Sequence, residues 1–127
     1  MRRTRSQRLH DELDKLCGDI VKERDGWRCR RCGADRDHGA VIQWAHIIRR
    51  SRSKAVRWNI DNGISLCNSC HVWLDRSADR IQAAFFVEKM IGKKKMEKLH
   101  ELANDKNAKS WLVCNLEEKL RELSSNI

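Results

Sequence analysis

Four cysteines constrain this chain more than any other feature of its sequence. They form two Cys-x-x-Cys pairs, Cys29 with Cys32 and Cys67 with Cys70. Each pair can present two thiolates from one tight turn, and four thiolates are the ligand set of a closed tetrahedral zinc site. A redox Cys-x-x-Cys motif would explain one pair only. A c-type haem attachment site, which the run Cys-Asn-Ser-Cys-His formally matches, would leave the first pair without a role. We therefore expect one structural zinc ion.

The length and composition of the chain favour a single domain around this zinc site. The sequence has 127 residues, 40% hydrophobic and 35% charged, and it contains no proline that could stiffen a linker. Residues 33–66 exceed what a small zinc ribbon needs between its cysteine pairs, so we expect this segment to fold. Cys17 and Cys114 have no partner at metal-ligand spacing and are predicted to be ordinary buried residues.

The charge balance favours an anionic partner. The chain has 27 Lys and Arg against 18 Asp and Glu, a net charge of +9. Nucleic acid is the commonest such partner, because Lys and Arg gain affinity by releasing counterions from phosphates, although ribosomal or membrane-surface binding gives the same gross charge. Five basic residues lie close together in a stretch without acidic residues: Arg49, Arg50, Arg52, Lys54 and Arg57. This run is either a solvated loop or a phosphate-binding surface.

The N-terminal stretch bears on the compartment. It is basic but has no apolar segment after it, which argues against a signal peptide. No apolar run approaches the length of a membrane span. We therefore expect a cytoplasmic protein that binds no membrane, in a compartment where cysteines bind metal rather than form disulfides.

Hydrophobic periodicity predicts helices on both sides of the cysteine pairs. In residues 6–24, leucine and isoleucine recur at three- and four-residue spacing opposite a charged face. We expect this helix to pack on a core, with contact to DNA as the alternative. The C-terminal half has the same pattern in three stretches: residues 79–91, 93–103 and 106–123. Their apolar stripes are expected in the core or in a subunit interface.

The segment between the pairs predicts two strands. Residues 40–48 are rich in β-branched and aromatic side chains, and residues 64–66 follow an Asn-Gly turn signal. A helix should follow, with Asn68 or Ser69 as its cap. The fold class is therefore α+β and mostly helical, with a small zinc-braced core of strand, turn, strand and helix. The expected single domain has three parts: a basic N-terminal helix in residues 1–25, the core in residues 26–78 and C-terminal helices in residues 79–127.

Polar residues of this core indicate chemistry. His71 and Asp75 are four residues apart on the predicted helix, so their side chains share a face and can hold one divalent ion. This spacing is common by chance on a surface helix. The metal-site interpretation gains weight from His46 on the preceding strand and from Asn62 at the turn between the strands.

In this order and spacing, the core resembles the HNH endonuclease family, whose ββα-metal motif places two strands and a helix around a divalent ion. The resemblance covers about residues 29–75, and two Cys-x-x-Cys knuckles often brace the motif. It implies that His46 is the general base and that Asn62 holds the loop of the base by hydrogen bonds. It also implies that His71 is a metal ligand, with Asp75 as a further ligand.

One residue departs from the family pattern. The position before the base is commonly an Asp or His that binds the metal, and here it is Ala45. The resemblance therefore implies either an ion held by fewer protein ligands and more water, or a substitute ligand such as His46.

The resemblance implies metal-dependent hydrolysis of DNA phosphodiesters. Neutral His46 is suited to deprotonating water, and Mg²⁺ or Mn²⁺ on His71 and Asp75 can act on the scissile phosphate. The products would be 5′-phosphate and 3′-hydroxyl ends, made by nicking as a monomer or by double-strand cutting as a homodimer. The alternative is a zinc-stapled DNA-binding module without catalysis, which Ala45 favours.

Overall fold

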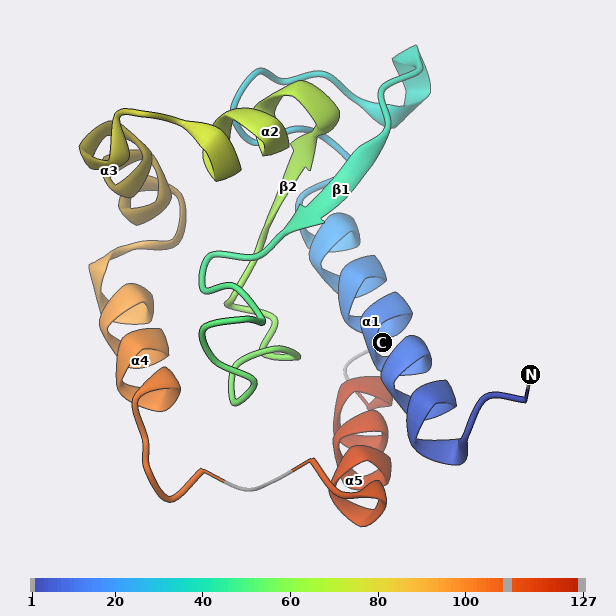
Figure 1. The fold of residues 1–127 in the computed structure, drawn as a ribbon. Helices are drawn as coiled ribbons and strands as arrows, with labels where there is room; N and C mark the ends of the chain where they lie inside the picture. Colours follow the sequence, from blue (N-terminus) through green and yellow to red (C-terminus); the bar gives the residue numbers. More distant parts are fainter. Residues whose placement is uncertain (1, 109–110, 126–127) are drawn as a thin grey trace.

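The structure is a computed structural model that describes residues 2–108 and 111–125. Figure 1 shows the order of the elements. They are α1 (Arg5–Arg24), the short 3-10 helix η1 (Arg36–His38), β1 (Ile42–Ala45), β2 (Ile64–Cys67), α2 (Asn68–Arg76), α3 (Arg80–Ile91), α4 (Lys93–Ala103) and α5 (Val113–Ser124). The predicted fold class is confirmed, because these residues form a mostly helical chain around one small strand pair.

The antiparallel strands β1 and β2 are central to this arrangement. Ala45 pairs with Ile64 at one end of the register. Successive strand side chains point to opposite faces, and the two faces meet different helices. Gln43 contacts His71 of α2, whereas the ring of Trp44 lies against Gly18 of α1. The strand pair is therefore sandwiched between α2 and α1.

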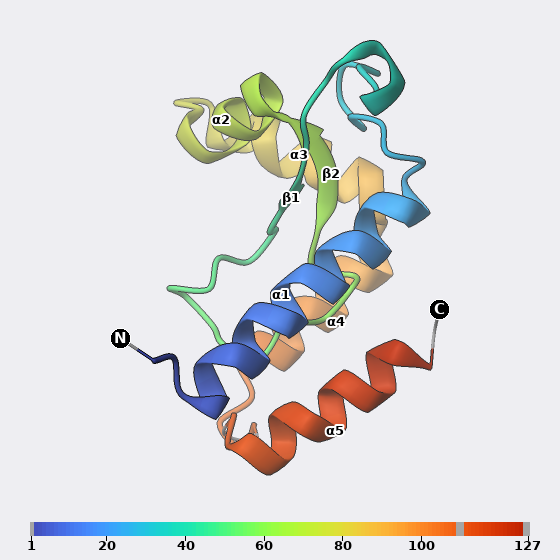
Figure 2. The same cartoon turned by 90° about the vertical axis from the view of Figure 1, so that its right-hand side faces the viewer.

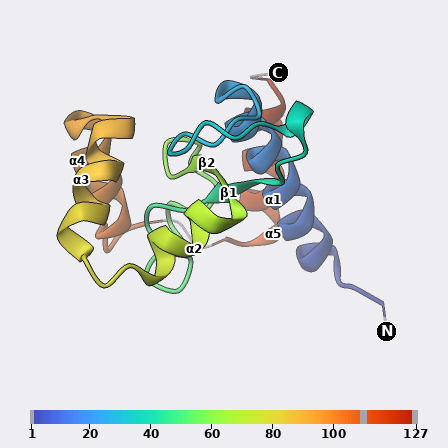
Figure 3. The ribbon, with the colours of Figure 1, turned by 90° about the horizontal axis from the view of Figure 1, so that it is seen from above.

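The flanking helices lie on the two sides of this ββα core. Figure 3 shows α3 and α4 on one side and α1 with α5 on the other, and Figure 2 shows α5 running alongside α1. Leu13 of α1 packs in one cluster with Leu116 and Leu123 of α5 and with Trp58 from the loop between the strands. On the other side, the same loop packs against Leu99 of α4.

Capping explains where the helices begin. The Thr4 side chain accepts a hydrogen bond from the Gln7 backbone N–H, and the Gln7 side chain accepts one from the Thr4 backbone N–H. Helix α1 therefore begins at Arg5, one residue before the predicted start. Asp79 caps α3 through its side chain. The predicted cap of α2 was wrong, because its N-cap is Cys67 and makes no side-chain hydrogen bond.

The first predicted strand, residues 40–48, was too long. The structure ends it at Ala45, because the backbone of Ile48 bonds to the side chain of Asn62 instead of to a neighbouring strand. The second strand extends one residue further than expected, to Cys67.

The last predicted helix, residues 106–123, also began too early. Residues 104–108 form turns, in which the Asp105 side chain accepts from the Asn107 N–H (2.9 Å), and α5 begins at Val113. Residues 109–110 of that prediction, and residues 1 and 126–127 of the predicted domain, lie outside the described residues. Cys17 is buried as predicted, but Cys114 is exposed, because Leu116 and Leu123 form the buried face of α5.

A buried carboxylate joins α1 to the core. The side chain of Asp25, at the end of α1, accepts from the backbone N–H of Ser65 in β2 (2.9 Å) and from the guanidinium groups of Arg24 and Arg30. Burial alone raises the pKa of a carboxyl, but these donors outweigh it and hold the pKa of Asp25 below its usual value. The side chain is fully enclosed, so this charge is a fixed link between helix and strand.

None of the helices within residues 2–108 and 111–125 combines the length and the apolar composition that crossing a bilayer requires.

Candidate functional site

The four cysteines come together as predicted. Their ligand atoms lie within 4.8 Å of one another, and the Sγ atoms of Cys32 and Cys67 are 3.6 Å apart. A tetrahedral zinc ion with Zn–S bonds of about 2.3 Å separates its sulfur ligands by about 3.8 Å. Gly33, with φ of 82°, makes the turn that aims the first pair. The cluster is compatible with structural zinc.

The four cysteines lie close enough to affect one another's ionisation. The Ser69 hydroxyl, 3.4 Å from Cys67 Sγ, lowers the pKa of the Cys67 thiol to about 6, whereas burial raises that of Cys70 to about 12. Several thiolates in one place repel one another, and a divalent ion removes that repulsion. Arg31 donates to Cys70 Sγ (3.5 Å) and stacks on the Trp73 ring, which ties the first turn to α2.

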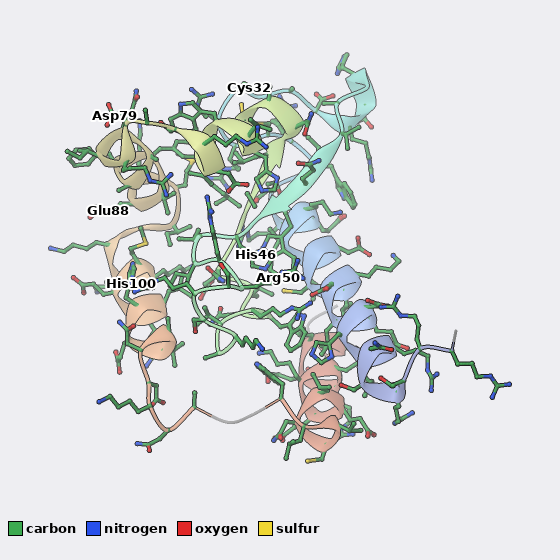
Figure 4. The ribbon with its side chains drawn as sticks, in the orientation of Figure 1. Cys32, His46, Arg50, Asp79, Glu88 and His100 are labelled. Carbon is green, nitrogen blue, oxygen red and sulfur yellow. The ribbon has the colours of Figure 1, made fainter. Side chains whose placement is uncertain are left out.

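A hollow of about 440 Å³ lies where β1, the loop that follows it, α1 and α2 meet. Figure 4 draws His46 and Arg50 beside α1 at this place. Its lining brings together residues that the sequence predicted and others that it did not: Asp14, Trp44, His46, Arg49, Arg50, His71 and Asp75. We call it the His46 hollow.

His46 is held in one tautomer. Its Nε2 lies 3.2 Å from the backbone carbonyl oxygen of Arg57, and because a carbonyl only accepts, Nε2 carries the proton. In the neutral ring Nδ1 is then unprotonated and basic. The ring is half-buried against Trp44, with centroids 3.9 Å apart. Burial lowers the pKa of His46 below its ordinary value, which favours the neutral ring.

Asn62 closes the loop that follows His46. Its side chain is fully buried and makes three hydrogen bonds, accepting from Ile48 N–H (2.7 Å) and donating to the carbonyl oxygens of Ile48 and Val56 (both 3.0 Å). The next residue must be glycine, because a Cβ on Gly63 would lie 1.8 Å from Trp44 Nε1. The Asn62-Gly63 pair, which predicted a turn, therefore also holds the loop through the hydrogen bonds of Asn62.

His71 and Asp75 face one another on α2. Gln43 Oε1 accepts from His71 Nδ1 (2.7 Å), which leaves Nε2 as the lone-pair nitrogen, 3.4 Å from Asp75 Oδ2. Two ligands about 2.1 Å from one ion at a right angle are about 3 Å apart, so this pair fits a shared divalent ion after a small adjustment. Gln43 orients the histidine as outer residues orient metal ligands elsewhere.

Ala45 offers no ligand at this place. It is fully buried, and it lies on the same face of β1 as Gln43, toward α2. Among the described residues, the four cysteines are the one group of three or more His, Cys, Asp or Glu side chains close enough to hold an ion. Near Ala45, the two side chains of the predicted second site that face one another are His71 and Asp75.

A family comparison matches this part of the chain. The model described as HNH endonuclease covers residues 29–78, which contain both cysteine pairs, His46, Asn62 and His71. Residues 29–78 are therefore similar to the HNH endonuclease family. Searches of curated proteins and of solved structures returned no significant match. We call residues 29–78 the HNH segment.

The five basic residues of the run from Arg49 to Arg57 do not behave alike. Arg49 and Arg50 line the His46 hollow, where Arg49 donates to the backbone oxygen of Asp75 (2.8 Å). Arg52 lines a second hollow that also reaches His46, and Lys54 is exposed. Arg57 points inward, because its side chain is 16% exposed and pairs with Asp14 of α1 (2.8 Å). Of these five residues, Arg49, Arg50 and Arg52 therefore line the hollows at His46.

The neighbouring hollow, about 320 Å³, also reaches His46, Arg49 and Asp75. Its far wall comes from α3 and α4 and includes Arg80 and His100, the latter labelled in Figure 4. Sequence reasoning assigned no role to these two residues. They lie outside the HNH segment, and a single basic residue on an amphipathic helix gives no signal of function.

Asp14 and Gln43 were also missed. Asp14 lies on α1 directly after a core leucine, where charged residues usually face solvent, and Gln43 reads as an ordinary strand residue. Only the fold brings them to the His46 hollow and to His71, respectively.

Proposed function

We propose that this protein is a metal-dependent DNA endonuclease in which the HNH segment and its flanking helices act as one domain. The observation that carries the proposal is the His46 hollow. There, within a family-matched segment, a histidine with a free Nδ1 lies beside a facing histidine–aspartate pair and two arginines.

His46 is the proposed general base. Its Nδ1 takes the proton from the attacking water, while the Arg57 carbonyl keeps Nε2–H in place and thereby fixes the ring orientation. Burial lowers the pKa of His46, so the base is neutral and active at physiological pH. Asn62 acts on the same residue indirectly, since it fixes the loop at Ile48, two residues after His46.

His71 Nε2 and the Asp75 carboxylate are the proposed ligands of the catalytic ion. A hard divalent cation such as Mg²⁺ or Mn²⁺, when bound, polarises the scissile phosphate. Gln43 keeps His71 in the ligating tautomer. With alanine at position 45, this position would supply no ligand, and water or phosphate oxygens would have to provide the rest.

DNA is the proposed substrate. The net charge of +9 favours a polyanion, and arginines border both hollows that meet at His46. Arg49 and Arg50 lie at one hollow, and Arg52 and Arg80 at the other. A phosphodiester backbone lying across His46 would therefore meet cations on both sides of the scissile phosphate.

A zinc-stapled DNA-binding module without catalysis is the second candidate. The observation that favours it is Ala45, whose buried methyl group occupies the place of a family metal ligand. It predicts DNA binding that does not depend on a divalent ion.

Metal removal distinguishes the two candidates. Supercoiled plasmid is incubated with the protein after mild chelation, and then with Mg²⁺ or Mn²⁺ restored, while zinc content is measured in parallel. The endonuclease predicts no cleavage after chelation, nicked or linear DNA on restoring the ion, and zinc retained throughout. Binding without cleavage in every divalent ion would favour the non-catalytic module.

A further inference from the structure

We propose that Asp14, on α1 and outside the HNH segment, is a positioning residue for His46. The inference rests on the proposed function, in which His46 is the base. The family match begins at Cys29, so it contains nothing about α1. The fold nevertheless brings this helix to the His46 hollow, where Asp14 is one of the lining residues.

The Asp14 carboxylate is bound to two consecutive residues of the loop between the strands. Oδ1 accepts from Trp58 Nε1 (2.8 Å) and from Arg57 Nε (3.2 Å), and Oδ2 accepts from Arg57 Nη2 (2.8 Å). This bidentate pairing with a guanidinium is the strongest geometry available to a carboxylate. The Arg57 side chain is 16% exposed and Trp58 is fully buried, so neither has solvent as a ready replacement.

Those two residues carry the contact that orients the base. The backbone carbonyl of Arg57 accepts the Nε2–H of His46 (3.2 Å). Because Asp14 fixes the side chains of Arg57 and Trp58 together, it fixes the peptide group between them. Asn62 holds the same loop from the other end, through Val56. Asp14 is therefore connected to His46 by two contacts of Arg57: its guanidinium binds Asp14 (2.8 Å), and its carbonyl accepts from His46 (3.2 Å).

Asp14 also balances charge around the base. Burial is the largest influence on the pKa of His46 and lowers it, and the hydrogen bond to the Arg57 carbonyl raises it. The charges of Arg50 and Arg57 lower this pKa, while the charge of Asp14 raises it. The Arg50 guanidinium lies 3.6 Å from Asp14 Oδ2. The other titratable or charged groups of the hollow are Arg49, His71 and Asp75. Loss of Asp14 would leave two arginines unopposed beside the base and weaken it.

Asp14→Asn tests the proposal, because it removes the charge but retains the size and one acceptor oxygen. Single-turnover cleavage is measured with Asp14→Asn in the wild-type and in the His46→Ala background. We expect a loss of about tenfold or more in the cleavage rate with His46 present, and a change of less than about twofold without it. An equal loss in both backgrounds would overturn the proposal, since Asp14 would then act through folding or DNA binding.

Asp19→Asn is the matched control. It lies on the same helix, changes the net charge by the same amount and pairs with Lys15 (3.0 Å) rather than with the loop of His46. It should leave both rates unchanged. If Asp14→Asn does not fold, Asp14→Glu replaces it, because glutamate retains the charge but moves the carboxylate by one methylene. Its rate loss should likewise require His46.

Histidine ¹⁵N NMR tests whether Asp14 positions His46 without requiring a cleavage assay. The wild-type spectrum should show His46 with its proton on Nε2, and Asp14→Asn should add the Nδ1–H tautomer or shift the His46 titration downward. Identical His46 signals in the two proteins would overturn the role of Asp14. Absence of cleavage by the wild-type protein would instead contradict the proposed function and leave this measurement valid.

Discussion

Different forces hold the two sides of the central strand pair. On the α2 side the buried cluster is built mainly from cysteines and small or aliphatic residues of the strands, among them Ala45 and Ile64. On the α1 side, large side chains such as Leu13 and Trp58 fill a cluster between α1, α5 and the loop. The first side includes the four-cysteine cluster, which is compatible with zinc. The second depends on burial itself.

Different kinds of sequence pattern predict the two sides of the strand pair. Metal ligands must come from specific residue types at specific spacing. The sequence pattern therefore predicts the zinc-compatible site and the histidines of the HNH segment. An apolar helix face needs only periodicity. Asp14 and Asp25 connect the two sides, and neither metal-ligand spacing nor hydrophobic periodicity predicts their contacts.

The largest effect should follow from loss of a cysteine ligand. Cys67→Ser is expected to abolish zinc binding and unfold the α2 side, because metal binding contributes directly to folding in such sites. Zinc analysis and thermal unfolding measure this, with exposed Cys114→Ser as the control that should change neither. Retention of the wild-type melting transition by Cys67→Ser would show that both sides are held by apolar packing.

A smaller effect is expected on the α1 side. Leu13→Ala should lower the free energy of unfolding by about 2–5 kcal/mol, because the side chain is fully buried and its loss leaves a cavity. Denaturant titration measures the change, and bound zinc should stay at the wild-type level below the transition. Leu112→Ala, at a site 63% exposed, is the matched control. Loss of zinc from folded Leu13→Ala would mean that the two sides are not separately held.

The link at Asp25 should contribute less. Asp25→Asn removes a buried charge that accepts from Ser65 N–H and two guanidinium groups, so we expect a loss of about 1–3 kcal/mol. Because the folded pKa is lowered, this stability is present above the unfolded pKa and is lost as the pH falls through the folded pKa. Acid titration of stability should therefore flatten in Asp25→Asn. An unchanged acid limb would remove Asp25 from the connection between the two sides.

The smallest effect concerns the surface between the hollows. Arg52→Ala should weaken DNA binding and reduce the salt dependence of affinity by about one phosphate contact, without changing stability. Fluorescence anisotropy over a range of salt concentrations gives the slope. Lys94→Ala removes an exposed charge of the same sign on α4 and should leave the slope nearly unchanged. Equal slopes for the two variants would show that Arg52 is a solvated loop residue that makes no phosphate contact.

Several features of the fold were predictable because local chemistry decides them. The bounds of α4 agree with the predicted residues 93–103, since Gly92 and Asn104 flank a clear apolar stripe. Others depend on distant contacts. The early end of β1 results from Asn62, which replaces strand pairing with side-chain hydrogen bonds at Ile48.

The candidate site divides in the same way. Helical spacing suggested His71 and Asp75, and the resemblance to the HNH family suggested His46 and Asn62. The structure adds which nitrogen of each histidine is free. No spacing rule could suggest Asp14, because its partners Arg57 and Trp58 are far along the chain and only packing of α1 brings them together. The roles of these residues in catalysis stay predictions.

Replacement of His46 tests the central claim most directly. Cleavage by His46→Ala is compared with cleavage by His38→Ala, a histidine of the same segment that is 85% exposed and pairs with Asp35 instead. Both variants should bind DNA and zinc as the wild-type protein does. We predict that His46→Ala loses at least about 100-fold in cleavage rate, whereas His38→Ala keeps the wild-type rate. Full activity in His46→Ala would contradict the account.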